Sequence, residues 1–183
     1  MRLVYCLGYG EDELLGSGRL SSRNGGTPQF WKVFYSCLNP VTRNEDFAPV
    51  QVSRTPLPER LFQKVRILEQ LREQGVWLLD ASIAALYIPG QRKPSINLIE
   101  AALTTSWDTY VGAALRTASP QAILVVGFSV ARILRQRLNR LGIPWGAVPQ
   151  PNARLSSQDH FAIYADYCRV CRRPETVSSL SRF

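Results

Sequence analysis

Metal-binding side chains are scarce in this sequence, which has a single histidine, His160, and four cysteines spread along 183 residues. Because the cysteines are scattered and no secretion signal precedes them, we expect reduced thiols rather than disulfides. Cys168 and Cys171 form one C-x-x-C pair, but no second pair matches it. A zinc or iron–sulfur site would need two further ligands, so we expect no metal and no other cofactor.

Long hydrophobic runs are also missing. No apolar segment approaches the ~20 residues of a membrane-spanning helix, and the first strand-like segment, Leu3–Leu7, is too short for the core of a signal peptide. We therefore expect a soluble, cytoplasmic protein. A chain of 183 residues is long enough for one well-buried core and short for two ordinary domains. This predicts one domain over residues 1–172 and a frayed tail over 173–183.

Acidic residues are few relative to basic ones. The chain has 14 Asp and Glu against 22 Lys and Arg, which gives a net charge of +8 at pH 7. Such an excess favours a polyanionic partner, nucleic acid above all, over an acidic small substrate. A basic enzyme without a polyanionic partner is the alternative.

Short apolar runs alternate with helical patterns along the chain. The predicted strands are continuous apolar runs rather than alternating ones: Arg2–Leu7, Val76–Leu79, Ile123–Val126 and Trp145–Val148. Strands of this kind are buried on both faces, so they predict a three-layer α/β fold with helices on both sides of a short, mainly parallel sheet. Ligands of such folds bind at the carboxyl ends of the strands. The loops expected to meet there are 8–27, 80–94, 127–129 and 149–156.

Two of the predicted helices carry an extended apolar face. After Thr55 as N-cap, helical spacing is kept by Leu61, Val65, Leu68 and Leu71. After Ser95 as N-cap, it is kept by Ile99, Leu103, Trp107, Tyr110 and Ala114.

Three further helices are predicted. One begins at Phe30 and ends at Asn39, before a proline. Another begins near Ser129, and its apolar residues alternate with arginines, which is typical of a solvated face. Ser156 and Asp159 resemble a capping box at the start of the last helix.

Four segments resemble those of mismatch-specific uracil and thymine DNA glycosylases and of the related hypoxanthine glycosylases, in the same order. PQFWKVFY (28–35) is similar to the segment after the first active-site loop, and GVWLLD (75–80) to the strand that ends in the base-reading residue. VVG (125–127) resembles the third core strand, and VPQPNARLS (148–156) the second catalytic motif with its DNA-wedging loop. The chain thus resembles the uracil-DNA glycosylase superfamily. That resemblance implies a monomer that flips a base out of duplex or single-stranded DNA and hydrolyses its glycosidic bond.

The first motif departs from that family. Most relatives have a polar residue followed by proline, whereas this chain has Gly8–Asp12 (GYGED), with Gly10 at the polar position. Glu11 or Asp12 would then have to position or activate the water. Asn97 is a second candidate, because hypoxanthine-type relatives also lack the usual residue. Cleavage develops positive charge on the sugar and negative charge on the base, so one carboxylate or amide near C1′ could suffice.

The resemblance also implies base-binding roles. Asp80 stands where many relatives carry an asparagine that pairs with uracil. An ionised aspartate only accepts hydrogen bonds, so it suits an exocyclic amino group or a ring N–H. Phe30 is expected to stack on the flipped base, with Tyr9 as its substitute beside Gly10. Asn152 is expected to donate to the base or to orient the water.

The remaining expected contacts are with the DNA itself. Arg154 and Leu155 would enter the double helix as the base leaves it. Ser129 and Ser156, at helix starts, would donate to phosphates.

The sequence does not identify the base that would be excised. Acceptor-only Asp80 and the glycine-rich first loop favour a modified cytosine, such as a hypermodified base of phage DNA, which implies a role in anti-phage defence. Uracil, mismatched thymine or hypoxanthine, and hence base excision repair, are the other candidates. Because the usual residue of the first motif is missing, the alternative function is a catalytically inactive nucleic-acid-binding module of the same fold.

Overall fold

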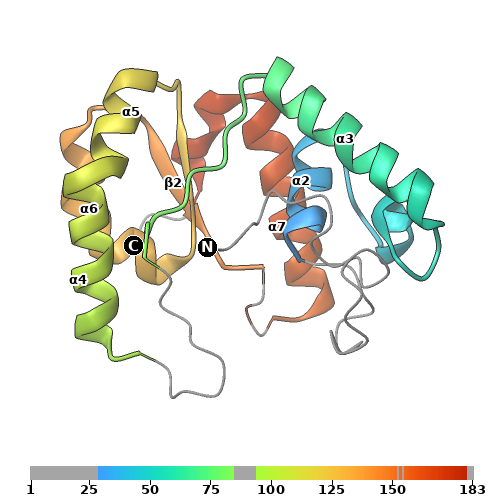
Figure 1. The fold of residues 1–183 in the computed structure, drawn as a ribbon, viewed down its shortest axis with the longest axis horizontal. Helices are drawn as coiled ribbons and strands as arrows, with labels where there is room; N and C mark the ends of the chain where they lie inside the picture. The colour runs from blue at the N-terminus through green and yellow to red at the C-terminus, as the bar shows by residue number, and fades with distance from the viewer. Residues whose placement is uncertain (1–28, 85–93, 152, 154, 181–183) are drawn as a thin grey trace. The chain divides into compact units, whose positions relative to one another are not determined.

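The computed structural model describes residues 29–84, 94–151, 153 and 155–180 (Figure 1). These residues fall into two compact units that alternate along the chain. The sheet unit contains residues 78–84, 94–150 and 173–180, and the helical unit contains 29–77, 151, 153 and 155–172. The predicted strand Arg2–Leu7 lies outside the described residues. One domain over residues 1–172 stays a prediction.

The sheet unit is built on two parallel strands, β1 (Ile123–Val126) and β2 (Trp145–Val148). Both have the bounds predicted from their apolar runs. The register aligns the first residues of the two strands. They are connected through α6 (Phe128–Arg140), because parallel strands need a long crossover. The described structure is therefore a mixture of helices and a short parallel sheet, as an α/β fold requires.

The predicted strand Val76–Leu79 is not among the strands of the described residues. Residues 76–80 are neither helical nor part of the β1–β2 sheet. Leu79 and Ala81 still pack against the hydrophobic core of the sheet unit. Packing against this core accounts for the apolar character of Leu79, whereas Trp77 is 74% exposed. The four-stranded, three-layer arrangement stays a prediction.

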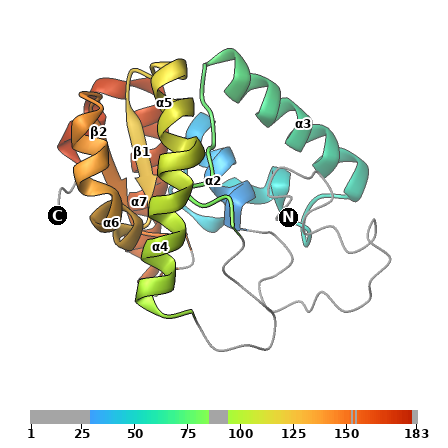
Figure 2. The same cartoon turned by 60° about the vertical axis from the view of Figure 1, so that its left-hand side comes forward.

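A long irregular helix covers the sheet in this unit. It consists of α4 (Ile96–Ser106), the π-helical turn η2 (Trp107–Val111) and α5 (Gly112–Ala118), which follow one another without a break (Figure 2). Its start is the predicted one, because the Ser95 hydroxyl caps it by accepting the Leu98 N–H at 3.2 Å.

The π turn changes which side chains of this helix are buried. Leu103 and Trp107 are buried as predicted, but the next buried position is Val111, and Tyr110 is 50% exposed. A π turn holds more residues than an α turn, so every later side chain is rotated about the helix axis. Gly112 permits this turn, since its N–H bonds to the Trp107 carbonyl and a Cβ would lie only 2.9 Å from Trp107 Nε1.

The arginines of α6 follow the predicted solvated face with one exception. Arg132, Arg135 and Arg140 are exposed. Arg137 instead reaches Asp108 on the π turn, donating from Nε at 3.1 Å and from Nη2 at 2.9 Å. The opposite face of α6 buries apolar side chains in the core, among them Leu134 and Leu138.

The C-terminal residues of the described chain are packed, which corrects the prediction of a frayed tail. Residues 174–179 form a 3₁₀ helix, η3 (Pro174–Ser179), and Val177 within it is 0% exposed. The backbone of η3 packs directly against Gly146 of β2, where a Cβ would overlap the Val177 carbonyl oxygen. A glycine in the buried strand therefore lets the tail backbone approach the sheet.

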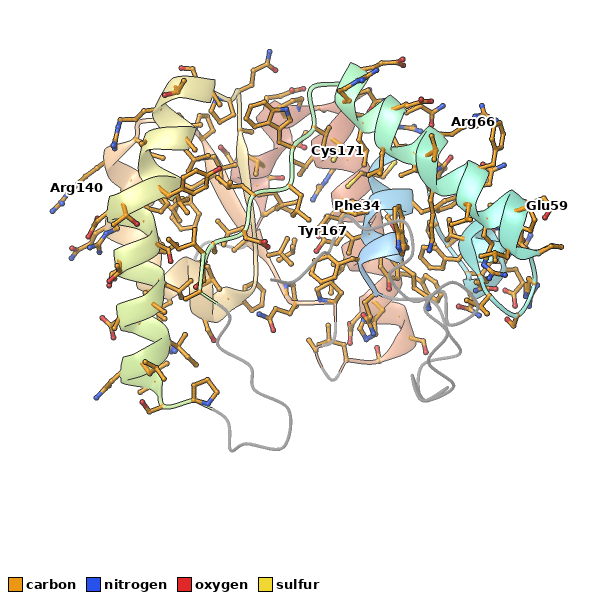
Figure 3. All side chains as sticks on the ribbon, viewed as in Figure 1. Phe34, Glu59, Arg66, Arg140, Tyr167 and Cys171 are labelled. Atoms are coloured by element: carbon orange, nitrogen blue, oxygen red, sulfur yellow. The ribbon has the colours of Figure 1, made fainter. Side chains whose placement is uncertain are left out.

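The helical unit packs α2 (Gln29–Leu38) against α7 (Ser157–Arg172) and α3 (Leu57–Glu73). Aromatic rings fill the space between these elements, and Phe34 and Tyr167 are labelled in Figure 3. The rings of Phe47 and Tyr164 meet edge to face, with centroids 5.0 Å apart. Both bounds of α2 agree closely with the prediction.

The fully buried face of α3 agrees with the predicted one only at Leu71, since Leu61 and Leu68 are half-buried. Its buried residues are Arg60, Lys64, Ile67 and Leu71, while Val65 is exposed. The N-cap is Pro56 rather than Thr55, whose hydroxyl donates to the Ala48 carbonyl at 2.6 Å.

No helix within the described ranges is long and apolar enough to cross a membrane.

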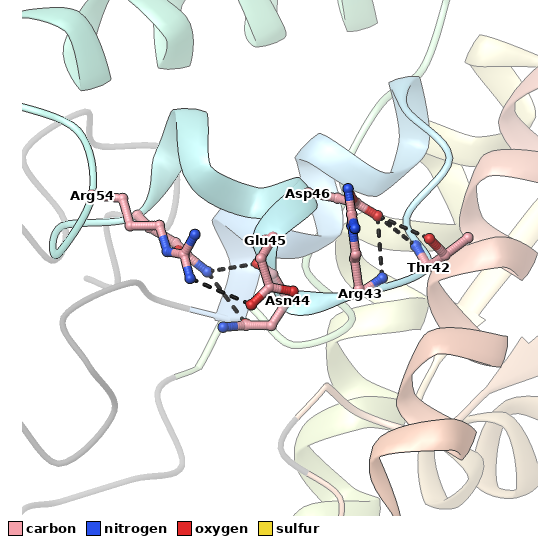
Figure 4. A network of polar contacts seen from close by, with 7 residues as sticks. Thr42, Arg43, Asn44, Glu45, Asp46 and Arg54 are labelled. Atoms are coloured by element: carbon pink, nitrogen blue, oxygen red, sulfur yellow. Dashed lines mark hydrogen bonds and ion pairs between the residues drawn. The ribbon is translucent and has the colours of Figure 1, made fainter.

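A polar network fixes the connection between α2 and α3 (Figure 4). In the 3₁₀ helix η1 (Asn44–Val50), Asp46 accepts the backbone N–H groups of Thr42 at 2.8 Å and Arg43 at 3.1 Å. These hydrogen bonds lower the pKa of Asp46. An ion pair joins Arg54 to Glu45 in the same connection, with 3.3 Å between Nη2 and Oε1.

Candidate functional site

The carboxyl edge of the two-stranded sheet brings together two of the predicted loops. Gly127 follows β1 and donates its N–H to the Val148 carbonyl at 2.8 Å. Its φ of +116° is a conformation that glycine adopts readily and other residues do not. Gln150 follows β2, and its Cγ lies 3.0 Å from the position of a Cβ on Gly127. The turn after β1 and the residue after β2 are therefore in contact, as the carboxyl-edge hypothesis expects.

Asp80 belongs to the same unit and carries a carboxylate open to solvent. Its neighbours Leu79 and Ala81 pack into the core, while Asp80 itself is exposed. The segment is anchored further along, where the Ile83 N–H donates to the buried Ser106 hydroxyl at 3.1 Å. Asp80 has neither an ion pair nor a side-chain hydrogen bond within the described part of the chain. A hydrogen-bond acceptor at this place is thus available to a ligand.

Two other predicted residues of the sheet unit lie in first helical turns. Asn97 is exposed in the first turn of α4, and Ser129 is exposed in the first turn of α6. No hydrogen bond joins either of them to Asp80, although all three residues are described. The structure places these side chains in one compact unit without forming them into a bonded cluster.

The remaining described candidates belong to the helical unit. Phe30 is half-buried in the first turn of α2, and Leu155 is exposed before α7. The Ser156 hydroxyl caps α7, accepting the Asp159 N–H at 3.1 Å and donating to the Asp159 carboxylate at 2.7 Å. Ser156 therefore has the capping role that its spacing from Asp159 predicts. The candidates Tyr9, Gly10, Glu11, Asp12, Asn152 and Arg154 lie outside the described residues.

Two buried cations in the helical unit were missed by the sequence patterns. Lys64 is 1% exposed, and its Nζ lies 4.7 Å from the centre of the Trp31 ring. Arg60 is 2% exposed and donates to the carbonyl of Val52 at 3.3 Å and to that of Thr55. Their spacing with Ile67 is that of one helix face, so the signal was present. A binary pattern does not predict this face, because it counts charged residues as solvent-facing.

Three thiols lie on the facing helices of this unit. Cys37, Cys168 and Cys171 are free thiols in the described structure, and Cys6 lies outside the described residues. A hydrogen bond with Cys37 lowers the pKa of Cys171 and, with burial, raises the pKa of Cys37 well above its usual value. Within the described residues, no three His, Cys, Asp or Glu side chains are grouped so that they could hold a metal ion.

The described geometry therefore contains one assembled feature, the Gly127–Gln150 contact at the carboxyl edge, with a solvent-facing Asp80 in the same unit. A carboxylate accepts hydrogen bonds and an amide both donates and accepts them, so each of these groups can contact a polar ligand. Comparisons of this chain with protein-family models, with curated proteins and with solved structures found no match.

Proposed function

We propose that this chain is a DNA glycosylase resembling the uracil-DNA glycosylase superfamily. It would turn a deaminated or modified base out of DNA and hydrolyse the N-glycosidic bond. The observation that carries this proposal is the contact between Gly127 and Gln150, because it joins two of the resembling segments at the carboxyl edge of the sheet. Ligands of parallel α/β folds bind at that edge. The net charge of +8 supports a DNA partner.

The proposed reaction breaks the bond between C1′ and the base nitrogen. The oxygen of a water molecule bonds to C1′, one water proton goes to the departing base, and an abasic site remains. Negative or dipolar groups near the sugar and donors near the base lower the barrier, because the transition state separates charge in this direction. Glu11, Asp12, Asn97 and Asn152 are the candidates for placing the water.

Asp80 is the proposed base-reading residue. Its solvent-facing carboxylate is held between two core-packed neighbours, and no described residue forms an ion pair with it that a base would have to displace. As an acceptor it matches the exocyclic amine of a cytosine derivative better than the O4 of uracil. A modified cytosine is therefore the preferred substrate of the proposal, with uracil, mismatched thymine and hypoxanthine as the other arms of the test.

The experiment is base excision followed by alkaline cleavage of abasic sites. The full chain is incubated with duplex and single-stranded oligonucleotides that carry uracil, a thymine mismatch, hypoxanthine, hydroxymethylcytosine or its glucosylated form. We expect strand cleavage at one of these bases. Salt-dependent binding of every oligonucleotide without cleavage of any would instead identify an inactive binding module. An affinity that does not change with salt would remove DNA as the partner.

Asp80→Asn tests the base-reading assignment. Replacing the carboxylate by an amide removes an acceptor and adds a donor, so excision of an amino-bearing base should fall by about tenfold or more, the scale of one good base contact. Excision of uracil should be spared or improved. The matched control is Glu100→Gln, an exposed acid of α4 in the same unit, which should leave both activities unchanged. Proportional loss of both activities in Asp80→Asn would show that the residue maintains the fold instead.

A further inference from the structure

A pocket of about 550 Å³ lies where the last turn of α6 faces the π turn η2 and the end of α5. Trp107, which is 6% exposed, contributes to its wall. Its charged and amide lining consists of Asp108, Arg116, Gln136, Arg137 and Arg140. The pocket is thus made of three guanidinium groups and one carboxylate, all within the sheet unit.

The charges in this pocket do not balance. Asp108 is engaged by Arg137 through two parallel hydrogen bonds, at 3.1 Å from Nε and 2.9 Å from Nη2. Arg116 and Arg140 are exposed and make neither an ion pair nor a side-chain hydrogen bond within the described ranges. Arg140 projects from the end of α6 (Figure 3). Among the described residues, the guanidinium groups of Arg116 and Arg140 therefore have no counter-charge.

The Asp108–Arg137 pair orients the third guanidinium. Because Asp108 takes the Nε and Nη2 edge, the Nη1 group of Arg137 is left for another acceptor. Guanidinium groups match the oxygens of phosphate in paired hydrogen bonds, and they stay charged at any physiological pH. Gln136 adds a neutral donor to the same lining.

The position of the pocket separates it from the carboxyl edge of the sheet. α6 begins directly after Gly127 and runs for 13 residues, a rise of about 20 Å at 1.5 Å per residue. The pocket lies at the far end of that helix, before β2 begins. A ligand bound there would contact neither Gly127 nor Gln150, because neither residue belongs to the pocket lining.

We propose that this arginine pocket is an anion site that binds a phosphate group of a nucleotide, either free or within a DNA strand. Arg116 and Arg140 supply the uncompensated charge, and Arg137 is positioned by Asp108 to add a further donor. The proposal goes beyond the glycosylase activity and does not depend on it. Arginines in the last turns of α5 and α6 also complement the helix dipoles, and that role alone is the competing explanation.

The test compares two double variants that remove the same charge from the full chain. Arg116→Gln with Arg140→Gln changes the pocket, whereas Arg132→Gln with Arg135→Gln changes exposed arginines of α6 outside its lining. Inorganic phosphate, a deoxynucleoside monophosphate and a duplex of unmodified DNA are titrated separately by calorimetry. Thermal unfolding of each variant confirms that the fold is kept.

We expect the pocket variant to bind at least one phosphate-bearing probe about tenfold or more weakly than the unsubstituted chain, because charge-assisted contacts are lost. The control variant should change by less than about twofold for the same probe. If the duplex is the source, the salt dependence of its binding should also flatten in the pocket variant. If a free nucleotide is the source, the monophosphate should show the loss and the duplex should not.

Equal binding by the two double variants for all probes would overturn the proposal and leave the helix-dipole role. Base excision is not a readout here, so missing glycosylase activity does not affect the result. Conversely, failure of phosphate binding leaves the excision assay interpretable. A single variant, Arg140→Gln, repeats the comparison with Arg132→Gln should the double variants unfold, and the same difference is expected in a smaller size.

Discussion

Gly146→Ala should release the C-terminal 3₁₀ helix from the sheet. A methyl group at position 146 would overlap the Val177 carbonyl oxygen and lie 3.0 Å from Leu180 Cβ. Both obstacles belong to the packed segment around η3, and one of them is backbone, so rotation of a flexible side chain cannot relieve the overlap. Either β2 or the segment must move.

The size of the effect follows from what each movement disrupts. Overpacking of a well-packed core costs about 1–3 kcal/mol. Burial of Val177 and Leu180 contributes about 1.5–3 kcal/mol each before the entropy of ordering the segment is subtracted. The net docking energy is therefore only a few kcal/mol. We expect the free energy of unfolding to fall by about 1–3 kcal/mol and the segment to detach rather than the sheet to distort.

Urea unfolding and amide hydrogen exchange measure the two parts of this prediction. The amides of Thr176 and Leu180, which bond to the carbonyls of Arg173 and Val177, should lose their protection in the variant. The control is Gly142→Ala, where φ is +70° but nothing lies within 4 Å of the added methyl group. Gly142→Ala should lower the free energy of unfolding by about 1 kcal/mol through backbone strain. The amides of residues 174–180 should keep their protection from exchange. Unchanged protection in Gly146→Ala would refute the packing of η3 on β2.

Two further predictions concern the helical unit. Ser156→Ala should lower the free energy of unfolding by about 0.5–2 kcal/mol, because it removes the N-cap of α7; Ser157→Ala is the matched control, and equal effects in urea unfolding would contradict the cap. Iodoacetamide should alkylate Cys171 before Cys37 and Cys168, because Cys171 is half-buried and hydrogen bonding with Cys37 lowers its pKa, whereas the other two are buried. A lower pKa keeps the thiolate of Cys171 present at lower pH, so labelling of Cys171 should persist as pH falls below the range in which free cysteine reacts. Mass spectrometry measures the order of labelling, and Cys168 labelled first would contradict the prediction.

Local rules were sufficient where one short signal determined the structure. The apolar runs at Ile123–Val126 and Trp145–Val148 are each bounded by glycine or proline, and both form strands with the predicted bounds. Ser95 and Ser156 have the spacing that capping requires, and both cap their helices. The caps were predictable because each contact lies within three residues, and the strands because their apolar runs have clear ends, although the strands pair across 22 residues.

The face of α3 could not be predicted in this way. A binary pattern assigns Arg60 and Lys64 to solvent, whereas the structure buries both. What makes burial tolerable lies outside the helix itself: carbonyl oxygens of the preceding loop accept from Arg60, and the Trp31 ring is one of the contacts of Lys64. Such compensation is a tertiary property, so the periodicity of Leu61 and Val65 predicted the wrong stripe.

The candidate site was predictable only in part for a related reason. The contact of Gly127 with Gln150 follows from parallel strands sharing an edge, and sequence order is enough to expect it. The cap role of Ser156 was also expected. The exposure of Asp80, in contrast, depends on the packing of Leu79 and Ala81 against the core. These residues do so without belonging to a strand of the described sheet, so a strand pattern does not predict it.

The arginine pocket depends on one irregularity that no periodic pattern contains. In a regular helix each residue advances by about 100° around the axis. The extra residue of the π turn therefore changes the direction in which the side chains after Trp107 point. The same shift that buries Val111 in place of Tyr110 also sets where Arg116 points, relative to Asp108 before it. Gly112 is the residue that allows the turn, because a side chain there would meet the Trp107 indole. The arrangement of the pocket is therefore a consequence of Gly112 and the π turn, and the arginines alone do not specify it.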